Sequence, residues 1–457
     1  MSEQRRVVVT GLGIVSPLGN DLDSTWSNII SGKSGAGRIT KFDPAGFSTT
    51  FAAELKGYNE ASGLSPKEIR RIDPFIQYAL TASDQAIKDS DLSLDDIEKT
   101  RIGVSIGSGI GGLGSIEDNA LILGDKGPRK ISPFFVPGAI INMASGNVAI
   151  KYNLQGPNIS IVSACSSAGH SIGYSARTIS YGDADIMITG GAEAGITPLG
   201  LAGFNAAKAL STNNENPEQA SCPWDKKRDG FLLGEGAGIL ILEELESAKS
   251  RKAKIYGEVV GFGQSDDAYH ITAPAEDGRG AYNAMINALN DFKEDHDKID
   301  YINAHGTSTP LGDVIEAKAI AEIFKGRKNL SVSSTKSMTG HLLGAAGAIE
   351  AIFCLLAMRD SVIPPTINLN DPDNEFDLDL TPNKSKTKEV NFTMSNSFGF
   401  GGAVCLALLA EEEREASLQG RLQDARNITG SNNGDAPTTS QPVGCRRRLS
   451  VPNRRRR

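Results

Sequence analysis

The sequence has no long apolar run and only five cysteines. No stretch approaches the length of a membrane-spanning helix, and the opening MSEQRRVVVTGLGIV is too rich in glycine for a secretion signal. The cysteines form neither a CxxC pair nor a regular framework, which argues against a zinc site and a disulfide scaffold. We therefore expect no membrane insertion and a reducing compartment: the cytoplasm, or an organelle matrix or stroma if a transit peptide was removed.

An excess of positive charge is also missing. The net charge is −8, which does not suggest a nucleic-acid-binding protein. Arginines concentrate in residues 412–457, a segment without apolar periodicity that we predict to be a disordered, dispensable tail. What the chain has in abundance is glycine, 50 of 457 residues, together with 39% hydrophobic residues. This composition is typical of a turn-rich α/β protein with a large core.

The clearest local pattern is NISIVSACSSAGHSIGYSA, residues 158–176. The β-branched run 159–162 predicts a short buried strand, and Ala168 and Ile172, four apart, predict one face of a closely packed helix. Cys165 then lies at a strand-to-helix corner, where backbone N–H groups and the positive end of the helix dipole favour a thiolate. The pattern predicts a nucleophile, although a buried structural cysteine fits the position equally well.

Two stretches of the second half repeat patterns of the first. NLSVSSTKSMTGH matches NISIVSACSSAGH with asparagine, serine, glycine and histidine in register, so that Cys165 aligns with Lys336 and the last residue is His341. IYGEVVGFG similarly resembles the opening VVVTGLGIV. These repeats predict an internal duplication, with halves over residues 1–253 and 254–411 whose equivalent corners meet at a pseudo-twofold interface.

One glycine-rich loop imitates a nucleotide-binding motif. GSGIGGLG follows a strand predicted over residues 101–107, and Gly107, Gly109 and Gly112 satisfy GxGxxG. The dinucleotide fingerprint also requires an acidic residue about 20 positions further on, at the end of the next strand, and none follows there. We therefore expect no nucleotide site.

Histidine is scarce, and two of the five histidines lie in glycine-flanked motifs. His305 lies in NAHGTSTPLGD and His341 in STKSMTGHLLGAAG. Two such residues beside a corner cysteine favour catalysis over packing, whereas His170, inside a predicted helix, is interpreted as structural. Glu350 interrupts an almost uniformly apolar helix and needs a partner. Lys336 is a candidate, and an exposed helix edge is the alternative.

The last motif is NSFGFGG, residues 396–402. Glycines on both sides of Phe400 permit a loop that moves and whose N–H groups face an oxyanion. A plain hairpin turn is the alternative.

Together these motifs resemble those of the β-ketoacyl-acyl-carrier-protein synthases, condensing enzymes of the thiolase superfamily, and most closely those of the synthase II branch. SACSSAGH, NAHGTSTPLGD, KSMTGHLLGAAG and NSFGFGG carry the resemblance, which covers residues 5–411. It implies a homodimer of α/β subunits with the thiolase fold, each a five-layered αβαβα sandwich of two duplicated halves. It also implies no cofactor, no metal and an acyl-carrier protein as partner.

The implied reaction is a decarboxylating Claisen condensation in fatty-acid elongation. Cys165 would take the acyl chain as a thioester, and malonyl-acyl-carrier protein would lose carbon dioxide and attack that thioester as an enolate. His305 and His341 would hold the malonyl thioester oxygen. Backbone N–H groups of Cys165 and Phe400 would form a second oxyanion hole.

The resemblance also assigns supporting residues. Lys336 and Glu350 would set charge and orientation around the histidines. A helix predicted over residues 66–88 would carry part of a basic docking surface, for which a solvated basic face is the alternative. The residues expected to bind substrate are Ile110, Phe204, Thr272, Thr307, Thr309 and Phe398. The residues expected to dock the carrier protein are Lys67, Arg70, Arg71, Arg129, Lys130 and Lys208.

Two other functions stay open at this point. A discrete polyketide-type ketosynthase has the same chemistry, and the motifs do not distinguish its substrates. A non-catalytic partner subunit, like the chain-length factors of polyketide systems, lacks the nucleophile, whereas Cys165 is present here. The preferred acyl chain length is not specified by these motifs.

Overall fold

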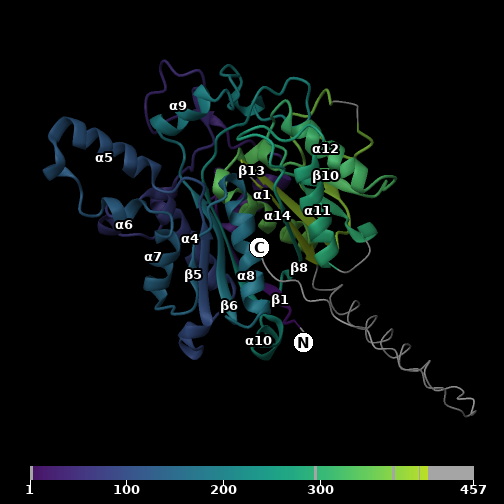
Figure 1. Ribbon diagram of the computed structural model, residues 1–457, viewed down its shortest axis with the longest axis horizontal. Helices are drawn as coiled ribbons and strands as arrows, with labels where there is room; N and C mark the ends of the chain where they lie inside the picture. The colour runs from purple at the N-terminus through teal and green to yellow at the C-terminus, as the bar shows by residue number, and fades with distance from the viewer. Residues whose placement is uncertain (1–3, 293–295, 373–375, 401, 410–457) are drawn as a thin grey trace, which may run out of the picture. The chain divides into compact units, whose positions relative to one another are not determined.

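Ten strands form one hydrogen-bonded sheet in the computed structural model, which describes residues 4–292, 296–372, 376–400 and 402–409 (Figure 1). The described residues belong to one unit, Met1–Arg414, and the predicted tail, residues 412–457, lies outside them. The sheet order is β10-β9-β13-β14-β8-β1-β7-β6-β4-β5. The first half of the chain supplies β1 (Val7–Val15), β4 (Ile102–Gly107), β5 (Asn158–Ile159), β6 (Ile186–Glu193) and β7 (Gly236–Glu244). The second half supplies β8 (Gly257–Ser265), β9 (Tyr301–Asn303), β10 (Ser331–Ser333), β13 (Phe392–Gly399) and β14 (Gly402–Leu409).

The two halves of this sheet have the same pairing pattern. β1 pairs antiparallel with β7, β7 antiparallel with β6, β6 parallel with β4, and β4 parallel with β5. The strands β8, β14, β13, β9 and β10 repeat this order and these directions. An antiparallel pairing of β1 with β8 joins the halves. The duplication predicted from the sequence is therefore confirmed by the topology.

Each half contains the same strand-to-helix corner. In the first half, the 3-10 turn η4 (Ala164–Ser166) leads directly into α8 (Ser167–Ser180). In the second half, η7 (Leu343–Ala345) leads directly into α14 (Ala346–Asp360). The first residue of each turn has a positive φ, 49° and 47° respectively, which a residue with a side chain adopts only under constraint.

This correspondence corrects the alignment made from the sequence. Cys165, in the middle of η4, is equivalent to Gly344 in the middle of η7 and not to Lys336. The second half has an additional short helix between β10 and η7, α13 (Lys336–Thr339), which has no counterpart between β5 and η4. The similar sequences NISIVSACSSAGH and NLSVSSTKSMTGH therefore belong to segments that are not structurally equivalent in the two halves.

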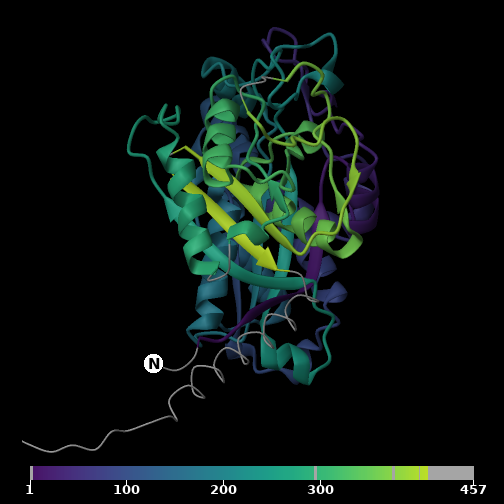
Figure 2. The same cartoon turned by 90° about the vertical axis from the view of Figure 1, so that its right-hand side faces the viewer.

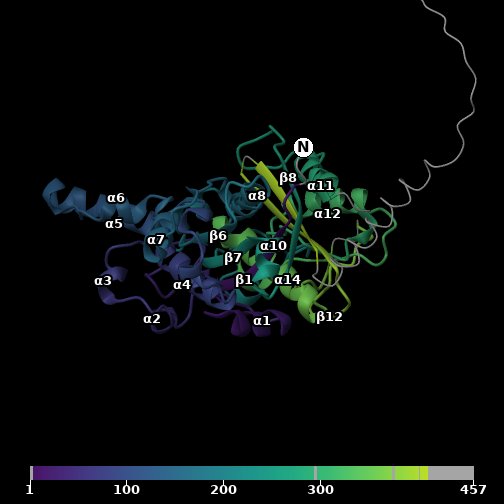
Figure 3. The same cartoon turned by 90° about the horizontal axis from the view of Figure 1, so that it is seen from below.

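Helices above, between and below the two half-sheets make five layers. α4 (Pro74–Asp89) and α7 (Met143–Tyr152) pack on the first half-sheet, and α11 (Arg279–Phe292) with α12 (Gly312–Ile323) covers the second. α8 and α14 pack on each other and on both half-sheets in the middle layer. Figures 1 and 3 both place α4 and α7 on the side opposite to α11 and α12. Figure 2 faces the second half, where the yellow strands β13 and β14 run side by side.

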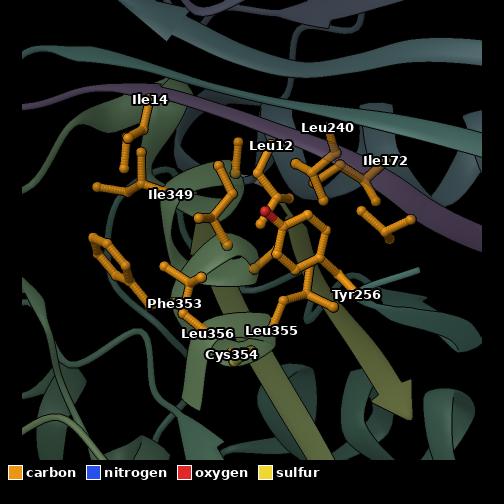
Figure 4. Packing of buried hydrophobic residues seen from close by; sticks show 14 of the residues in the cluster. Leu12, Ile14, Ile172, Leu240, Tyr256, Ile349, Phe353, Cys354, Leu355 and Leu356 are labelled. Atoms are coloured by element: carbon orange, nitrogen blue, oxygen red, sulfur yellow. The ribbon is translucent and has the colours of Figure 1, made fainter. Parts of the chain in front are cut away.

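The central helix α14 is buried on all sides. Its apolar residues, among them Ile349 and Phe353, pack against Leu12 of β1 and Ile172 of α8 (Figure 4). Each such side chain contributes about 1.5–3 kcal/mol when fully buried. Glu350 lies on the same helix with no exposed surface, so the alternative of an exposed helix edge is wrong.

The helix predicted over residues 66–88 is broken in two. α3 (Pro66–Ile69) ends before Arg70, and α4 begins at Pro74. The side chain of Asp73 accepts a hydrogen bond from the Phe75 N–H and caps α4. Because a residue before proline is pushed out of the helical region, Asp73 cannot continue α3, and Arg70 and Arg71 lie in the connection.

The strand before Cys165 is neither long nor buried. β5 has two residues and lies at the edge of the sheet, where Ile159 is 44% exposed and Val162, further along, is 55% exposed. The prediction of a buried strand is therefore wrong for the single chain. No helix in the described ranges is long and apolar enough to cross a membrane.

Candidate active site

A cavity of about 390 Å³ lies beside the two corners. The η4 turn, the loop after β9, the segment between α13 and η7 and the β13–β14 hairpin supply its chemically reactive lining. The predicted catalytic residues that line it are Cys165, His305, His341 and Phe400. The predicted binding and docking residues that line it are Phe204, Lys208, Thr272, Thr307, Thr309 and Phe398.

His341 contacts both Cys165 and His305. His341 Nε2 is 3.0 Å from Cys165 Sγ. The His305 and His341 rings meet edge to face, with centroids 5.3 Å apart. Hydrogen bonds hold the backbone at both histidines: the His305 N–H donates to Glu316 Oε1 at 2.8 Å and the His341 N–H donates to the Leu232 carbonyl at 2.7 Å. The three groups can therefore act on one bound thioester.

Both histidines are neutral at pH 7. Burial lowers the pKa of each imidazole well below its usual value, and the nearby Lys336 ammonium lowers it further. The Nδ1 atom of His305 is buried and has no hydrogen-bond partner among the described residues. An unpaired buried N–H costs more than an unpaired lone pair, which favours the tautomer with hydrogen on Nε2. His305 can then donate a hydrogen bond into the cavity.

The surroundings of Cys165 act on the charge of its thiol in opposite directions. Burial raises its pKa to about 12, although the Lys336 ammonium opposes this rise. The loss of water around sulfur thus opposes the thiolate that the helix N terminus and the positive charge favour, and the thiolate stays a prediction. Acyl transfer needs a proton acceptor, and His341 Nε2 is within reach of Sγ.

Lys336 and Glu350 form a buried ion pair. Each side chain is 1% exposed, and Lys336 Nζ donates to Glu350 Oε1. Burial raises the pKa of Glu350 to about 7, and the Lys336 ammonium opposes this rise. The same ammonium disfavours protonation of both histidines. The pair thus places one compensated positive charge close to the reacting groups without exposing it to water.

We expect Lys336→Ala to lower the free energy of unfolding by about 3–5 kcal/mol, because Glu350 is then buried without its partner. Replacing both residues by alanine should cost less than the sum of the two single replacements. Urea denaturation of the four proteins at pH 7 measures this coupling. Additive losses would show that the pair contributes no interaction energy.

The β13–β14 hairpin is held against the Cys165 corner. Ser166 Oγ donates to the Ser397 carbonyl at 2.9 Å, and a Cβ on Gly399 would lie 3.1 Å from the Cys165 nitrogen. Gly399 pairs with Gly402 across a tight turn that contains Phe400, so the hairpin alternative describes the observed backbone. Phe400 is 44% exposed and lines the cavity.

Ile110 does not line the cavity that contains Cys165. It lines a separate apolar hollow at the sheet edge, together with Val136, Ile140 and Val162. Of the six predicted docking residues, all are exposed and only Lys208 lines the Cys165 cavity. Arg71 stacks over the Phe134 ring at 4.8 Å, which brings the connection before α4 beside the segment that carries Arg129 and Lys130.

Two buried carboxylates and an aromatic contact at the site were not predicted from the sequence. Glu316 on α12 accepts the N–H groups of His305 and Gly306, and Phe231 packs edge to face on His341. Glu193, at the end of β6, accepts the N–H groups of the GxGxxG loop, which leaves them unavailable to a phosphate. Glu316 and Glu193 each lie inside a largely apolar stretch of the sequence. This is the same signal that predicted a partner for Glu350, so it could have identified them. Within the described residues, no three His, Cys, Asp or Glu side chains gather as a metal site would require.

Comparisons with known proteins agree with this geometry. The family models "Beta-ketoacyl synthase, N-terminal domain" and "Beta-ketoacyl synthase, C-terminal domain" match residues 4–248 and 256–370. Two relatives named 3-oxoacyl-[acyl-carrier-protein] synthase 2 are similar: one from Coxiella burnetii, 55% identical over 88% of this chain and 97% of its own, and one from Vibrio cholerae, 54% identical over 87% and 97%.

Solved structures show the same fold. A β-ketoacyl synthase from Burkholderia phymatum superposes with a TM-score of 0.83 at 34% identity, over 89% of this chain and 99% of its own. The structure of a ketosynthase in complex with its type II polyketide acyl-carrier protein gives the same TM-score, sequence identity and coverage. Three observations agree: the architecture of the chain, the corner that carries Cys165, and the similarity over nearly the whole described length. This chain therefore belongs to the β-ketoacyl synthase family.

Proposed function

We propose that this chain condenses an acyl-enzyme thioester with malonyl-acyl-carrier protein, with loss of carbon dioxide, and so gives 3-oxoacyl-acyl-carrier protein in fatty-acid elongation. The observation that carries the proposal is Cys165 Sγ at 3.0 Å from His341 Nε2, with the neutral His305 beside it. Identities above 50% to proteins named 3-oxoacyl-[acyl-carrier-protein] synthase 2 favour this function over a polyketide ketosynthase, for which the identity is 34%. The presence of Cys165 disfavours a non-catalytic partner subunit.

Acyl transfer is the first half-reaction. Cys165 Sγ attacks the carbonyl carbon of the acyl-carrier thioester, and His341 Nε2 takes the thiol proton. The N–H groups of Cys165 and Phe400 stabilise the tetrahedral oxyanion. The carrier thiolate leaves, takes that proton from His341 and departs as a thiol, which returns the imidazole to its neutral form.

Condensation is the second half-reaction. His305 donates a hydrogen bond from Nε2 to the thioester oxygen of malonyl-carrier protein. His341 donates to the same oxygen after its remaining proton has moved from Nδ1, which has no partner among the described residues, to Nε2. Loss of carbon dioxide then leaves an enolate at this oxygen. The enolate carbon attacks the Cys165 thioester, and the Sγ thiolate is expelled and reprotonated. Each donor at an enolate or oxyanion is worth about 10²- to 10³-fold in rate. Burial and the Lys336 ammonium keep both imidazoles neutral, so that each donates a hydrogen bond without adding a further positive charge to the site.

The reaction is tested by incubating the protein with acyl- and malonyl-acyl-carrier protein and weighing the carrier-bound product. We expect a 3-oxoacyl chain two carbons longer than the primer. Malonyl decarboxylation without elongation, or elongation only on a polyketide carrier protein, would refute the proposal. The reaction needs no metal or redox cofactor, because neutral histidines and backbone N–H groups stabilise both developing negative charges. We expect it to take place in the cytoplasm, or in an organelle matrix or stroma.

The acyl-carrier protein is expected to dock on local basic residues. The exposure of all six predicted residues supports this assignment, and the Arg71–Phe134 stacking brings two of the basic segments together. We predict that Arg70→Glu with Arg129→Glu raises KM for the carrier-bound substrate and flattens its dependence on salt. A pantetheine-analogue substrate is the control and should be unaffected. An unchanged KM would show that the acyl-carrier protein does not dock on this surface.

A homodimer is the expected assembly. The exposed apolar side chains of Ile159 and Val162 at the sheet edge, beside the hollow that contains Ile110, support a second copy as the partner of this edge. Sedimentation equilibrium should give twice the mass of one chain. Val162→Asp should shift the protein toward the monomer, whereas a dimer of unchanged stability would show that the interface lies elsewhere.

Ile110 is predicted to limit the acyl chain. Each buried methylene is worth about 0.8 kcal/mol, so a side chain that blocks the pocket a few carbons early discriminates steeply. We expect Ile110→Phe to keep activity on short primers and to lose it on long ones. Phe400→Ala is the control, since a residue over Cys165 should affect all lengths. Equal loss at every length for Ile110→Phe would contradict the assignment.

A further inference from the structure

Glu193 is the last residue of β6, and it has no exposed surface. Four neutral groups donate to it. Its Oε1 accepts from Ser108 Oγ at 2.9 Å and from the Ile110 N–H at 3.1 Å. Its Oε2 accepts from the Gly109 N–H at 2.7 Å and from the Gly344 N–H at 2.9 Å. One side chain thus holds the loop after β4 to the η7 turn before α14.

Both glycines are required for this contact. A Cβ on Gly109 would lie 2.9 Å from Glu193 Oε2. A Cβ on Gly344 would lie 2.7 Å from the same oxygen and 2.2 Å from the Gly109 nitrogen. A buried carboxylate whose donors are all neutral is costly, and an apolar side chain often serves packing at least as well. Burial of the Glu193 carboxylate therefore costs free energy. We look for the reason in the segments that this side chain holds in place.

The segments that Glu193 joins lie on either side of the reacting groups. The η7 turn begins with Leu343, which has a positive φ, lines the cavity and follows His341 by two residues. η7 packs against η4, which carries Cys165. The other segment contains Ile110. Movement of the carboxylate would therefore displace the Cys165–His341 pair and the Ile110 loop together.

We propose that Glu193 is a positioning residue for condensation, whose carboxylate fixes the η7 turn, and with it His341, relative to Cys165. The same carboxylate fixes Ile110, so that catalytic geometry and chain-length selection depend on one buried group. This inference rests on the proposed condensing function. Glu193 itself is not among the residues that line the cavity.

Glutamine and alanine at this position separate the two roles. In Glu193→Gln one oxygen remains, and the Ser108 hydroxyl can accept from the new amide NH₂. The least costly orientation keeps the oxygen on the Gly109 and Gly344 N–H groups and leaves the Ile110 N–H unpaired. Glu193→Ala removes the acceptor from all four donors. Glutamine should therefore loosen the Ile110 loop alone, whereas alanine should loosen the loop and the η7 turn.

The test combines hydrogen–deuterium exchange with single-turnover kinetics. Mass spectrometry follows amide exchange in a peptide containing Gly109 and Ile110 and in a peptide containing Gly344. Acyl transfer and condensation are timed with a ladder of acyl-carrier proteins. For Glu193→Ala we expect faster exchange in both peptides and condensation slower by about 10²-fold, as for small misplacements of reacting groups. For Glu193→Gln we expect faster exchange in the first peptide only, and a changed length profile with short primers condensed at a near wild-type rate.

Glu243→Gln is the matched control. Glu243 is a buried carboxylate on β7, opposite Ile186 at the other end of the same strand pair, where it pairs with Arg251. It should lower the thermal midpoint without changing the ratio of the half-reactions or the length profile. If Glu193→Ala condenses at the wild-type rate, or if its half-reactions fall together as in a merely destabilised protein, the proposal is wrong. If that variant does not fold, an unchanged length profile in Glu193→Gln refutes the proposal. A wild-type protein that does not condense would instead count against the proposed function.

Discussion

Cys165→Ala is expected to abolish the acyl-enzyme and all elongation. Intact-mass measurement after addition of acyl-carrier protein should show one acyl group on the wild-type chain and none on the variant. Elongation should fall by roughly 10⁴-fold or more, as is usual when a covalent nucleophile is removed. The reason is that Cys165 Sγ lies beside His341 Nε2, whereas Cys222 and Cys354, the other cysteines whose side chains the structure describes, are buried elsewhere.

Malonyl decarboxylation provides the control for this variant. It depends on the histidines and not on the thiol, so Cys165→Ala should still release carbon dioxide from malonyl-acyl-carrier protein. Cys222→Ala should acylate and elongate like the wild type. An acyl label that maps to Cys222 or Cys354 would show that the nucleophile has been assigned incorrectly.

His305→Ala is expected to slow condensation by about 10²- to 10³-fold, through loss of one donor at the enolate oxygen. Acyl transfer should be almost unchanged, because His305 makes no contact with Sγ that would be needed for proton removal. His341→Ala should slow both half-reactions, since His341 Nε2 lies 3.0 Å from Cys165 Sγ. Timing the two half-reactions separately checks this difference, and equal losses for the two variants would contradict it.

The same histidines predict a pH dependence. Burial and Lys336 hold the pKa of each folded-state imidazole well below the unfolded value of about 6.5. The unfolded chain therefore binds protons first as the pH falls, and this contribution to stability, present above about pH 6.5, is lost below it. His305→Asn, which cannot titrate, should reduce the loss of the thermal midpoint between pH 7 and 5. An identical acid sensitivity would show that other groups control it.

The sequence located the residues whose role depends on local backbone. Cys165, His305 and His341 each lie beside glycine or serine in a corner or loop, and such turn chemistry is visible in a few consecutive letters. Glu350 could be predicted to need a partner because a carboxylate inside an apolar helix is costly. Lys336 was named as a candidate partner, and the structure shows the pair.

Other features depend on contacts that no local pattern specifies. Glu193 is held by backbone N–H groups of distant segments, and Glu316 by those of the loop 10 and 11 residues before it. Every residue type except proline supplies such a group, so no local pattern marks the donors. The register of the duplication was wrong because α13 is present in only one half, a difference that matching letters conceal. The apolar run at β5 predicted burial, but burial of an edge strand is decided by what packs on it. The break at Pro74, in contrast, was readable from the proline and its capping aspartate.

The mirrored sheet also has a consequence for biosynthesis. β1 emerges first from the ribosome, yet its partner β8 begins only at Gly257, well past the middle of the described chain. Until β8 arrives, β1 is the open edge of a half-formed sheet, and α8 lacks α14 beside it. Nascent chains of this length expose an unpaired strand and an apolar helix face, both of which promote aggregation. Folding of this enzyme during translation should therefore depend on chaperones that shield the first half while the second is made.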